Sequence, residues 1–498
     1  MSLKKTSLFS VLGAMLSVVS CVVASCSSDD EEFTSSASTQ ITFSADTISF
    51  DTVFTTIGSA TKIFKIYNPN SKGVRFTSVR LGSDGSSGFR VNLDGQYGTQ
   101  FTDVEVYHED SLFCFVEVTV NPHDSDSPIL ITDSLLFSVE NGRTFSVQLQ
   151  AWGQDVVMLH APVFTSATDT LSATRPVVVT DSLVVGPGAT LTIAAGTTLC
   201  FHKGAGVSVH GTIVCNGTQE RPIILRGDRT DKLFPYLPYD RLDAQWEGIR
   251  LHPESYGNRF THCDIHGGNY GIVAETSDPQ QAKCNIESCI LHNVAGPALY
   301  LFNTKAEIAN TQISNALGGC ATVIGGNTLF THCTLAQFYP WSAQHAPALQ
   351  FANVADEKEY PLQQIEFRNC IITGYSDDEV YGSRMQDSDA AFNYMFRNCL
   401  INTVISDDIA EYFPGCLFDQ DTKEKETDEA ADTPTPRRES NFVTIDTENF
   451  YYDFRLDSLS AARKLADPTY SVGICTTDML GTQRPAEHPD AGCYQSTF

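Results

Sequence analysis

Apolar and polar residues alternate along much of the first third of the chain. Residues 61–68 (TKIFKIYN), 112–120 (LFCFVEVTV) and 143–152 (RTFSVQLQAW) all repeat with a period of two, which is the pattern of half-buried β-strands. Asn-Pro-Asn, Asp-Gly and Glu-Asn-Gly turn signals punctuate this region. Short strands at this spacing predict a β-sandwich over residues 40–155.

The pattern changes near residue 173. Residues 182–227 consist of very short apolar stretches separated by glycine-rich corners, too closely spaced for the hairpins of a sandwich. A six-residue template then recurs: apolar, any, Asn/His/Ser, Cys or Thr, any, apolar. Its fourth position is filled by Cys263, Cys289, Thr311, Cys333, Cys370 and Cys399, at steps of 26, 22, 22, 37 and 29 residues. Such steps are typical of a solenoid with insertions.

The spacing inside the template predicts a bend. The first apolar residue lies three positions before the cysteine and the last lies two after it, so one straight strand cannot place all three on one face. Asn tolerates the left-handed conformation that such a bend requires. The residues expected at the bend are His262, Ser288, Asn310, His332, Asn369 and Asn398.

The recurring cysteines are expected to point inward as buried thiols. Thr311 in one coil indicates that side-chain volume matters more there than sulfur chemistry. Disulfides and a metal site are the alternatives. Side chains stacked one strand spacing apart lie wider than a disulfide prefers, and no Cys-x-x-Cys pair occurs.

Both regions resemble known families. The order SFDTVF, KIFKIYNPN, FCFVEVTVNP and VQLQAWGQ resembles immunoglobulin-like spacer modules. The glycine-cornered run, followed by WEGIRL at 246–251, resembles the opening coils of right-handed parallel β-helix proteins of the pectin-lyase-like type. These resemblances imply an all-β chain, with an N-terminal immunoglobulin-like β-sandwich at 40–155 followed by a right-handed parallel β-helix at 160–498.

The end of the chain resembles the terminal cap of surface β-helix proteins. The matching residues are Asp478, Gly481, Arg484, Pro485, Asp490, Gly492 and Tyr494. The resemblance implies that residues 453–498 cover the open edge of the last coil. Residues 419–441, which are charged and poor in apolar side chains, are expected to form a flexible surface loop.

The N-terminus has the features of a signal peptide at 1–25. Lys4 and Lys5 precede an apolar run that is short for a membrane span. The run ends in VASC, which resembles a bacterial lipobox and implies lipidation of Cys26, with Cys21 as the alternative. The following SSDDEE, in an acidic flexible linker at 26–39, resembles the export signal of Bacteroidetes surface lipoproteins.

That resemblance implies a palmitate-bearing protein anchored in the outer membrane and facing the exterior. An ordinary secretory signal is the alternative. The formal net charge of −28 repels nucleic acid and anionic polysaccharides at long range. We therefore expect no nucleic-acid partner and keep polysaccharide as a possible one. Oligomeric state leaves no readable signal.

One sheet of the expected β-helix offers a candidate ligand-binding face. If Ile249, Ile272, Leu299, Ala321 and Leu349 face inward, Arg250, His252, Glu275, Tyr300 and Phe302 face outward. The rings of Tyr300 and Phe302 are suited to stacking on a sugar. The alternative is a solvated surface whose aromatics are covered by the insertion 229–245.

This face lacks the carboxylate pair that glycoside hydrolysis needs. We therefore expect no catalytic residue, no cofactor and no metal. The protein is predicted to be a surface lipoprotein whose β-helix binds glycans or the cell envelope, or is displayed toward them. A carbohydrate-active β-helix enzyme, either a polysaccharide lyase or a glycoside hydrolase, and a structural or adhesin-like component are the alternatives.

Asp-Ser/Thr followed by an aliphatic residue recurs along the chain and resembles the O-glycosylation signal of exported Bacteroidetes proteins. The resemblance implies glycans on Thr47, Thr52, Ser111, Ser134, Thr170, Ser182 and Ser458. A polar turn meeting a strand is the simpler explanation. Intact-mass analysis of the protein purified from its host tests this expectation, because a polypeptide-plus-lipid mass alone would contradict it.

Overall fold

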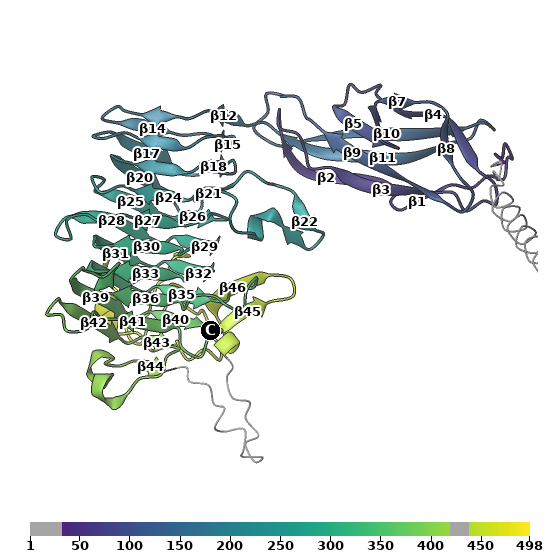
Figure 1. Ribbon diagram of the computed structural model, residues 1–498. Helices are drawn as coiled ribbons and strands as arrows, with labels where there is room; N and C mark the ends of the chain where they lie inside the picture. The colour runs from purple at the N-terminus through teal and green to yellow at the C-terminus, as the bar shows by residue number, and fades with distance from the viewer. Residues whose placement is uncertain (1–31, 419–437) are drawn as a thin grey trace, which may run out of the picture. The chain divides into compact units, whose positions relative to one another are not determined.

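The computed structural model describes residues 32–418 and 438–498, and the chain divides into two compact units (Figure 1). One unit holds the described residues up to Asn121 together with Ile129–Gly153, and the other holds Pro122–Pro128 and Gln154–Phe498. The predicted signal peptide, Cys26 and most of the predicted loop 419–441 lie outside the described residues. No helix within the described ranges is long and apolar enough to span a membrane.

The N-terminal unit is built from two antiparallel sheets. The first pairs β1 (Thr42–Phe43), β3 (Lys62–Tyr67), β9 (Ser111–Val118), β5 (Phe89–Leu93) and β6 (Gln96–Gly98) in that order. The second pairs β2 (Thr47–Phe54), β11 (Thr144–Gln154), β10 (Ile129–Val139), β4 (Val74–Leu81) and β7 (Gln100–Phe101), with β8 (Val104–Val106) also on β4.

The two sheets share one apolar core. Phe64 of the first sheet lies edge-on to Phe137 of the second, with ring centroids 6.4 Å apart. Buried and exposed residues alternate along β9 and β11, because successive side chains of a strand point to opposite faces. The predicted all-β sandwich is therefore the observed architecture of this unit.

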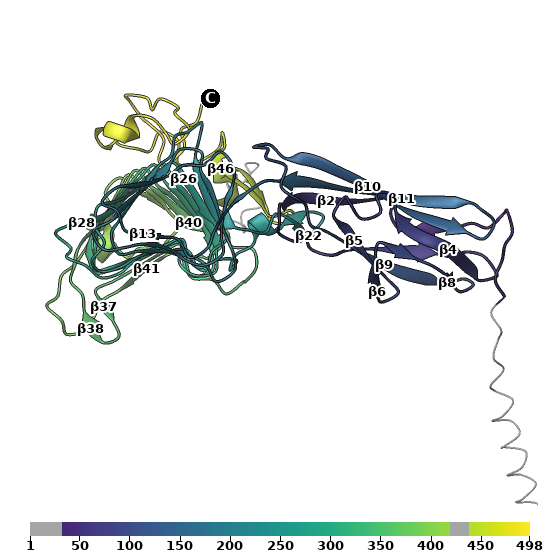
Figure 2. The ribbon, with the colours of Figure 1, turned by 90° about the horizontal axis from the view of Figure 1, so that it is seen from above.

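The C-terminal unit is a parallel β-helix with three long sheets, whose coils lie over one another when seen from above (Figure 2). Sheet 1 contains β12 (Val157–Leu159), β15 (Val177–Val179), β18 (Thr198–Phe201), β21 (Ile223–Gly227), β26 (Cys263–His266), β29 (Ile290–Val294), β32 (Gln312–Ala316), β35 (Thr334–Gln337), β40 (Ile371–Gly374), β43 (Leu400–Ile401) and β44 (Leu417–Phe418).

Sheet 2 contains β13 (Val163–Phe164), β16 (Leu183–Val185), β19 (Val207–Val209), β24 (Ile249–Leu251), β27 (Ile272–Ala274), β30 (Leu299–Phe302), β33 (Ala321–Ile324), β36 (Leu349–Ala352) and β41 (Val380–Ser383). Sheet 3 contains β14 (Asp169–Leu171), β17 (Thr190–Ala194), β20 (Thr212–Asn216), β25 (Asn258–Thr261), β28 (Ala282–Glu287), β31 (Lys305–Ala309), β34 (Gly326–Thr331), β39 (Leu362–Arg368) and β42 (Phe392–Arg397).

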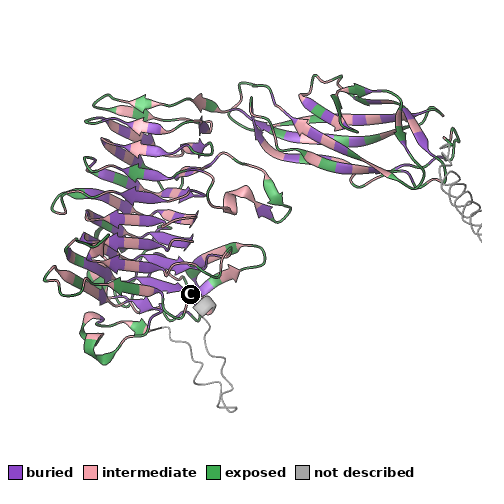
Figure 3. Ribbon diagram, viewed as in Figure 1, coloured by how far each residue is buried: buried purple, intermediate pink, exposed green. Residues whose placement is uncertain are grey.

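The inner faces of the three sheets form one continuous apolar core. Buried residues recur along the strands of successive coils (Figure 3). The residues predicted to face inward on sheet 2, from Ile249 to Leu349, are paired in register from coil to coil and are at most 1% exposed. Aromatic rings also stack along the axis, as between Phe330 and Phe367, whose centroids lie 4.3 Å apart. The predicted orientation of these strands is confirmed.

Each predicted bend joins sheet 3 to sheet 1 through a left-handed residue. The φ values are 46° at His262, 53° at Ser288, 49° at Asn310, 51° at His332, 55° at Asn369 and 52° at Asn398. The predicted bend is confirmed at every repeat, and residues that tolerate this conformation occupy it. We call this line of residues the corner.

A buried free thiol follows every corner residue except Asn310, which is followed by buried Thr311. The sulfur of these thiols has a role that the sequence did not reveal. The amide of Cys263 donates to Sγ of Cys289 at 3.3 Å, and the amide of Cys289 donates to Oγ1 of Thr311 at the same distance. Thr311 therefore replaces a cysteine because it is compact and also accepts the hydrogen bond of the preceding coil. Cys416 continues this ladder beyond Cys399.

We expect the ladder cysteines to resist alkylation in the native protein. Burial raises the pKa of the Cys263, Cys289 and Cys370 thiols, so little of their reactive thiolate is present at neutral pH. Half-exposed Cys416 should react first, and the remainder should react only after denaturation without reductant. Peptide mapping of iodoacetamide-treated protein measures this. Linked peptides joining Cys263 to Cys289 would show the disulfide alternative to be right.

The C-terminal segment runs alongside the corner and does not close the last coil. Asn310 donates from Nδ2 to the carbonyls of Ile474 (3.0 Å) and Thr477 (2.9 Å). Asn369 donates to the carbonyl of Asp467 (2.8 Å) and accepts from its amide (2.8 Å). The expectation of a cap over the open edge was therefore wrong, because the polar corner side chains bind this segment coil by coil.

The residues of the cap-like motif fix this segment. Asp478 accepts the amides of Leu480 (2.9 Å) and Thr482 (2.7 Å), which closes a turn. Buried Arg484 donates to Oδ1 of Asn310 and to the carbonyl of Gly492, both at 3.0 Å. The hairpin of β45 (Phe442–Asp446) and β46 (Tyr451–Leu456) covers the apolar outer face of β35, β40 and β43.

His332 makes this packing sensitive to acid. Burial, and then the charge of Arg484, lower its pKa well below the usual value. The unfolded chain therefore binds a proton below about pH 6.5 that the folded chain does not, so the free energy of unfolding falls there by up to about 1.4 kcal/mol per pH unit.

Asn occupies the same corner in other coils, so His332→Asn should fold and should lose less stability than the wild type between pH 6.5 and 4.5. Urea unfolding at several pH values measures the difference. Parallel pH profiles for the two proteins would contradict this account.

Candidate functional site

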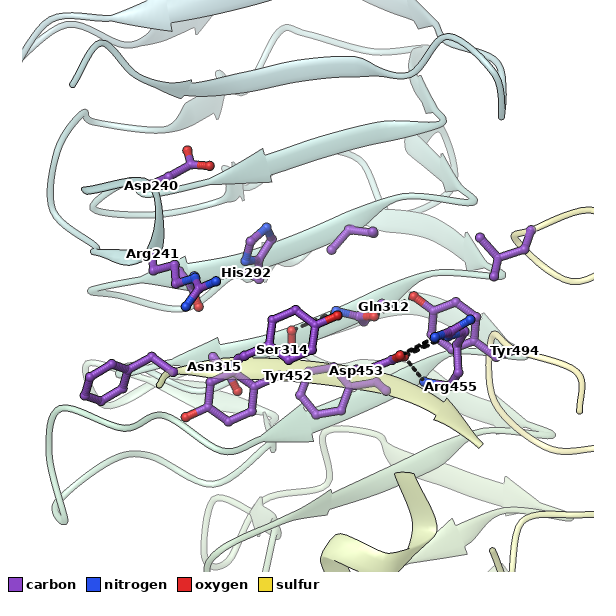
Figure 4. Close-up of a pocket in the computed structure, with 16 residues that line it drawn as sticks. Asp240, Arg241, His292, Gln312, Ser314, Asn315, Tyr452, Asp453, Arg455 and Tyr494 are labelled. Atoms are coloured by element: carbon purple, nitrogen blue, oxygen red, sulfur yellow. Dashed lines mark hydrogen bonds and ion pairs between the residues drawn. The ribbon is translucent and has the colours of Figure 1, made fainter. Parts of the chain in front are cut away.

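A groove of about 540 Å³ lies on the outer face of sheet 1 (Figure 4). Its floor comes from β29 and β32, one wall from the hairpin β45–β46, and the other from the short helix η1 (Tyr239–Arg241) of the insertion 229–245. The lining residues are Asp240, Arg241, Ile290, His292, Asn293, Gln312, Ser314, Asn315, Phe450, Tyr451, Tyr452, Asp453, Phe454, Arg455, Leu480 and Tyr494.

Hydrogen-bonded polar groups line the floor and the wall. Gln312 donates to Oγ of Ser314 at 3.1 Å and accepts from the hydroxyl of Tyr494 at 2.7 Å. Asp453 and Arg455 form an ion pair on the hairpin. Burial opposes ionisation of Asp453, but the hydrogen bonds and charge of Arg455 outweigh it and lower the pKa of the carboxyl. The groove therefore offers preorganised donors and acceptors beside aromatic side chains.

An aromatic platform adjoins the groove. We define it as Phe234, Tyr236, Trp341 and Phe450, which come from three separate segments. Ring centroids lie 5.7 Å apart for Phe234–Tyr236, 6.3 Å for Tyr236–Phe450 and 4.2 Å for Trp341–Phe450. Phe234 is 50% exposed, Tyr236 51% and Trp341 37%. Exposed rings gathered in this way are typical of a binding surface.

Phe450 occupies an unfavourable backbone conformation. Its φ is 53°, and a left-handed conformation costs a residue with a side chain on the order of 1–2 kcal/mol. The carboxylate of Asp446 accepts the amides of Glu448 (3.0 Å) and Asn449 (2.9 Å) and so fixes the turn. Stacking against Trp341 offsets part of the strain, and strained residues of this kind cluster at functional sites.

Two histidines and two carboxylates meet at the end of the groove. His266 faces Asp264 through Nδ1 (2.7 Å) and Asp240 through Nε2 (2.8 Å), and Nε2 of His292 lies 3.1 Å from Asp264. Arg226 pairs with Asp240 at 2.9 Å. Burial alone would lower the pKa of His266, but the two carboxylates raise it to about 9. We call Asp264, His266 and His292 the histidine cluster.

The face predicted from the sequence lies on sheet 2 and is separate from this groove. Arg250 Nη1 lies 2.9 Å from Glu275, and His252 Nδ1 lies 3.2 Å from it. The rings of Tyr300 and Phe302 are 6.3 Å apart. The structure thus gathers the three polar residues into one cluster and places the two rings beside each other.

Phe302 packs edge-on against Tyr360, at 4.6 Å. The insertion 229–245 instead lies against sheet 1, where Asp240 meets His266. The alternative that this insertion covers the two aromatics is therefore wrong.

Ser208 joins the cluster on sheet 2. Its hydroxyl lies 2.8 Å from Nε2 of His252, whose Nδ1 faces Glu275. Ser208 and Arg250 are register partners on β19 and β24. The order hydroxyl, imidazole, carboxylate is that of a nucleophile, a general base and an orienting group. His210 stacks on His252 with ring centroids 3.9 Å apart.

The seven hydroxyls proposed to carry glycan are all at least partly exposed. Thr52 lies in β2, Ser134 in the middle of β10 and Thr170 in β14. Asp133, which precedes Ser134, accepts hydrogen bonds from the hydroxyls of Ser83 and Ser87, both at 2.5 Å. At this position the aspartate therefore has a structural role of its own.

The sequence contained a signal for the histidine cluster that the cysteine alignment passed over. His266 lies three residues after Cys263, and His292 lies three residues after Cys289. Two residues at the same place in consecutive coils stack one strand apart, as their register shows. The aromatic platform had no such signal, because its members come from unrelated segments.

Comparisons with known proteins bear mainly on the fold. A family described as right handed beta helix region matches residues 247–407, which is less than half of the chain. No curated protein matches the sequence significantly. A family 123 glycoside hydrolase from Clostridium perfringens is 7% identical over 23% of this chain and 25% of its own length, with a TM-score of 0.16.

Two other solved structures share small parts. PapD-like domain 7 of human CEP192 is 10% identical over 24% of this chain and 87% of its own, with a TM-score of 0.17. A protein of unknown function from Porphyromonas gingivalis W83 is 14% identical over 26% and 58%, with a TM-score of 0.18. At these TM-scores no functional argument follows. The family match and the parallel sheets together show an all-β chain with a right-handed β-helix.

Proposed function

We propose that the β-helix binds a neutral glycan in the groove on sheet 1. The observation that carries this proposal is the aromatic platform, with Tyr236 and Trp341 exposed and stacked around Phe450, beside a groove of hydrogen-bonded polar groups. A sugar ring presents an apolar face that packs on aromatic rings, and hydroxyls that pair with partly exposed polar groups of the groove such as His292 and Asn293.

Charge supports a neutral ligand over an anionic one. The chain carries a formal net charge of −28, which lowers the local concentration of polyanions at moderate salt. Inside the groove, Arg455 is already paired with Asp453, and Arg241 donates to the carbonyl of Asn449 at 2.5 Å. Because both guanidinium groups already have partners, they help to form the groove and are not available to pair with the carboxylate of an acidic sugar.

Binding of the purified protein to arrays of neutral and acidic oligosaccharides tests the proposal. We expect retention on neutral chains long enough to reach from the platform into the groove. Retention on acidic chains alone, or on none, would contradict it. Measuring reducing ends released from the bound glycans in the same samples separates binding from cleavage.

We also propose that the protein is a lipoprotein of Bacteroidetes type, anchored at Cys26 on the outside of the outer membrane. The lipobox-like VASC and the acidic residues after it support this, and the immunoglobulin-like unit would then be the spacer between anchor and β-helix. Cys26→Ala should move the protein from membrane to soluble fractions, whereas Cys21→Ala should not. Membrane retention of the Cys26→Ala protein would contradict the assignment.

The cluster on sheet 2 supports a second candidate, an esterase acting on acylated glycans. Ser208 Oγ would attack the ester carbonyl as His252 takes its proton. The alcohol would leave with that proton, and water would then release the acyl group from Ser208. A fluorophosphonate probe should label Ser208 in the wild type and nothing in Ser208→Ala. An unlabelled wild-type protein would remove this candidate.

A further inference from the structure

We propose that Asp264, His266 and His292 bind one divalent transition-metal ion of the zinc class. Asp264 and His266 lie two residues apart on β26, so their side chains share the outer face of sheet 1. His292 is the register partner of His266 on β29. The parallel ladder therefore brings an Asp-x-His pair and a third ligand to one point.

The distances suit a metal centre. One ligand atom from each of the three residues lies within 4.8 Å of the others. Oδ1 of Asp264 is 2.7 Å from Nδ1 of His266 and 3.1 Å from Nε2 of His292. A tetrahedral zinc ion, with bonds of about 2.0–2.1 Å, separates its ligand atoms by about 3.3 Å. Small side-chain rotations would bring all three atoms to this spacing.

Groups behind the cluster are arranged as they are behind metal-bound histidines. Nε2 of His266 faces Asp240 at 2.8 Å, and Asp240 is itself held by Arg226 at 2.9 Å. A carboxylate on the far ring nitrogen fixes the tautomer and the ring orientation of a metal-bound imidazole. His266 is 5% exposed, so the ring has little freedom to turn away from this position.

The chemistry of the ligands selects the ion. Two imidazole nitrogens and one carboxylate oxygen suit zinc and its neighbours, whereas calcium and magnesium prefer oxygen ligands alone. Three protein ligands leave one position open, as in sites where zinc binds water or substrate. His292 and Asp240 also line the groove. A sugar oxygen would take this open position only if the proposed glycan function holds. Metal binding itself does not depend on that function.

The competing explanation is a metal-free cluster in which a protonated His266 bridges the two carboxylates. Titration of chelator-treated full-length protein with zinc chloride, in competition with a chromophoric chelator, separates the two. We expect one ion per chain, and at least 100-fold weaker binding for His292→Gln and for Asp264→Asn. Asp240→Asn should weaken binding by about 10- to 100-fold, the usual effect of a residue behind a ligand.

His202→Gln is the matched control. His202 faces Asp228 at 2.7 Å at the end of β18 on the same sheet, but it belongs to no group of three candidate ligands among the described residues. It should leave zinc affinity unchanged. Thermal unfolding shows whether each variant is folded. If a variant of the cluster does not fold, X-ray absorption of the zinc-loaded wild type should still show two imidazole nitrogens in the first shell.

Zinc binding that is absent, or equally strong in folded His292→Gln and in His202→Gln, would overturn the metal site. The proposal of glycan binding is tested independently of the metal site. Zinc binding without retention of any neutral oligosaccharide would leave the metal site standing and remove the proposed function. If neither zinc nor chelator changed the retention of glycan, the open position on the metal would not be part of the glycan-binding site.

Discussion

Replacing Trp341 with alanine is expected to weaken binding of a neutral oligosaccharide by about 10- to 100-fold, a loss of roughly 1.5–3 kcal/mol. The indole lies exposed against Phe450, with centroids 4.2 Å apart. It therefore supplies apolar area to a ligand and also holds Phe450 in its strained conformation. Tyr236→Ala should have a smaller effect, because its ring lies 6.3 Å from Phe450. Isothermal titration calorimetry with the neutral oligosaccharide that binds most tightly on the array measures both changes in affinity.

Tyr381→Ala is the control for these variants. Tyr381 is an aromatic residue of the same β-helix on β41, and it is 59% exposed. It lies on sheet 2 and lines none of the groove. Its removal should leave the affinity within about twofold of wild type. Equal losses for Trp341→Ala and Tyr381→Ala would mean that the aromatic platform is not the binding surface.

Replacing Asn369 with alanine is expected to destabilise the β-helix unit by about 3 kcal/mol. The side chain is fully buried and exchanges two hydrogen bonds of 2.8 Å with the backbone of Asp467. Each lost bond costs about 1 kcal/mol, and alanine at a φ of 55° adds on the order of 1 kcal/mol of backbone strain. Urea unfolding followed by far-UV circular dichroism measures the loss.

Two further variants separate these contributions. Asn369→Gly removes the hydrogen bonds and tolerates the left-handed conformation, so it should be about 1 kcal/mol more stable than Asn369→Ala. Asn393→Ala removes an exposed amide that donates to the carbonyl of Gln363 at 2.9 Å, and it should change stability by less than about 0.5 kcal/mol. If Asn369→Ala matched Asn393→Ala, the C-terminal segment would not be held through the corner.

Local patterns predicted the local structure well. The alternation at 112–120 became β9 (Ser111–Val118), and the three-then-two spacing around Cys370 required the left-handed Asn369. Both follow from side-chain direction and backbone sterics, which act over a few residues. The cysteine alignment also placed consecutive coils in register.

The groove could not be predicted in this way. One wall of the groove is η1, and the other is the hairpin β45–β46, which lies about two hundred residues further along the chain. The course of the C-terminal segment depends on many separate hydrogen bonds to the corner, and no periodicity in residues 453–498 encodes them. The alternation of side chains along a strand correctly placed Arg250, Tyr300 and Phe302 on the outer face of sheet 2. It says nothing about where distant segments of the chain create a groove.

A crystal structure of the protein with the neutral oligosaccharide that binds most tightly tests the central claim most directly. The account predicts a sugar ring packed on Trp341 and Tyr236, with further units extending over Gln312 and Ser314 toward His292. Density for the sugar on the Tyr300 and Phe302 face, with the groove on sheet 1 occupied only by solvent, would contradict it.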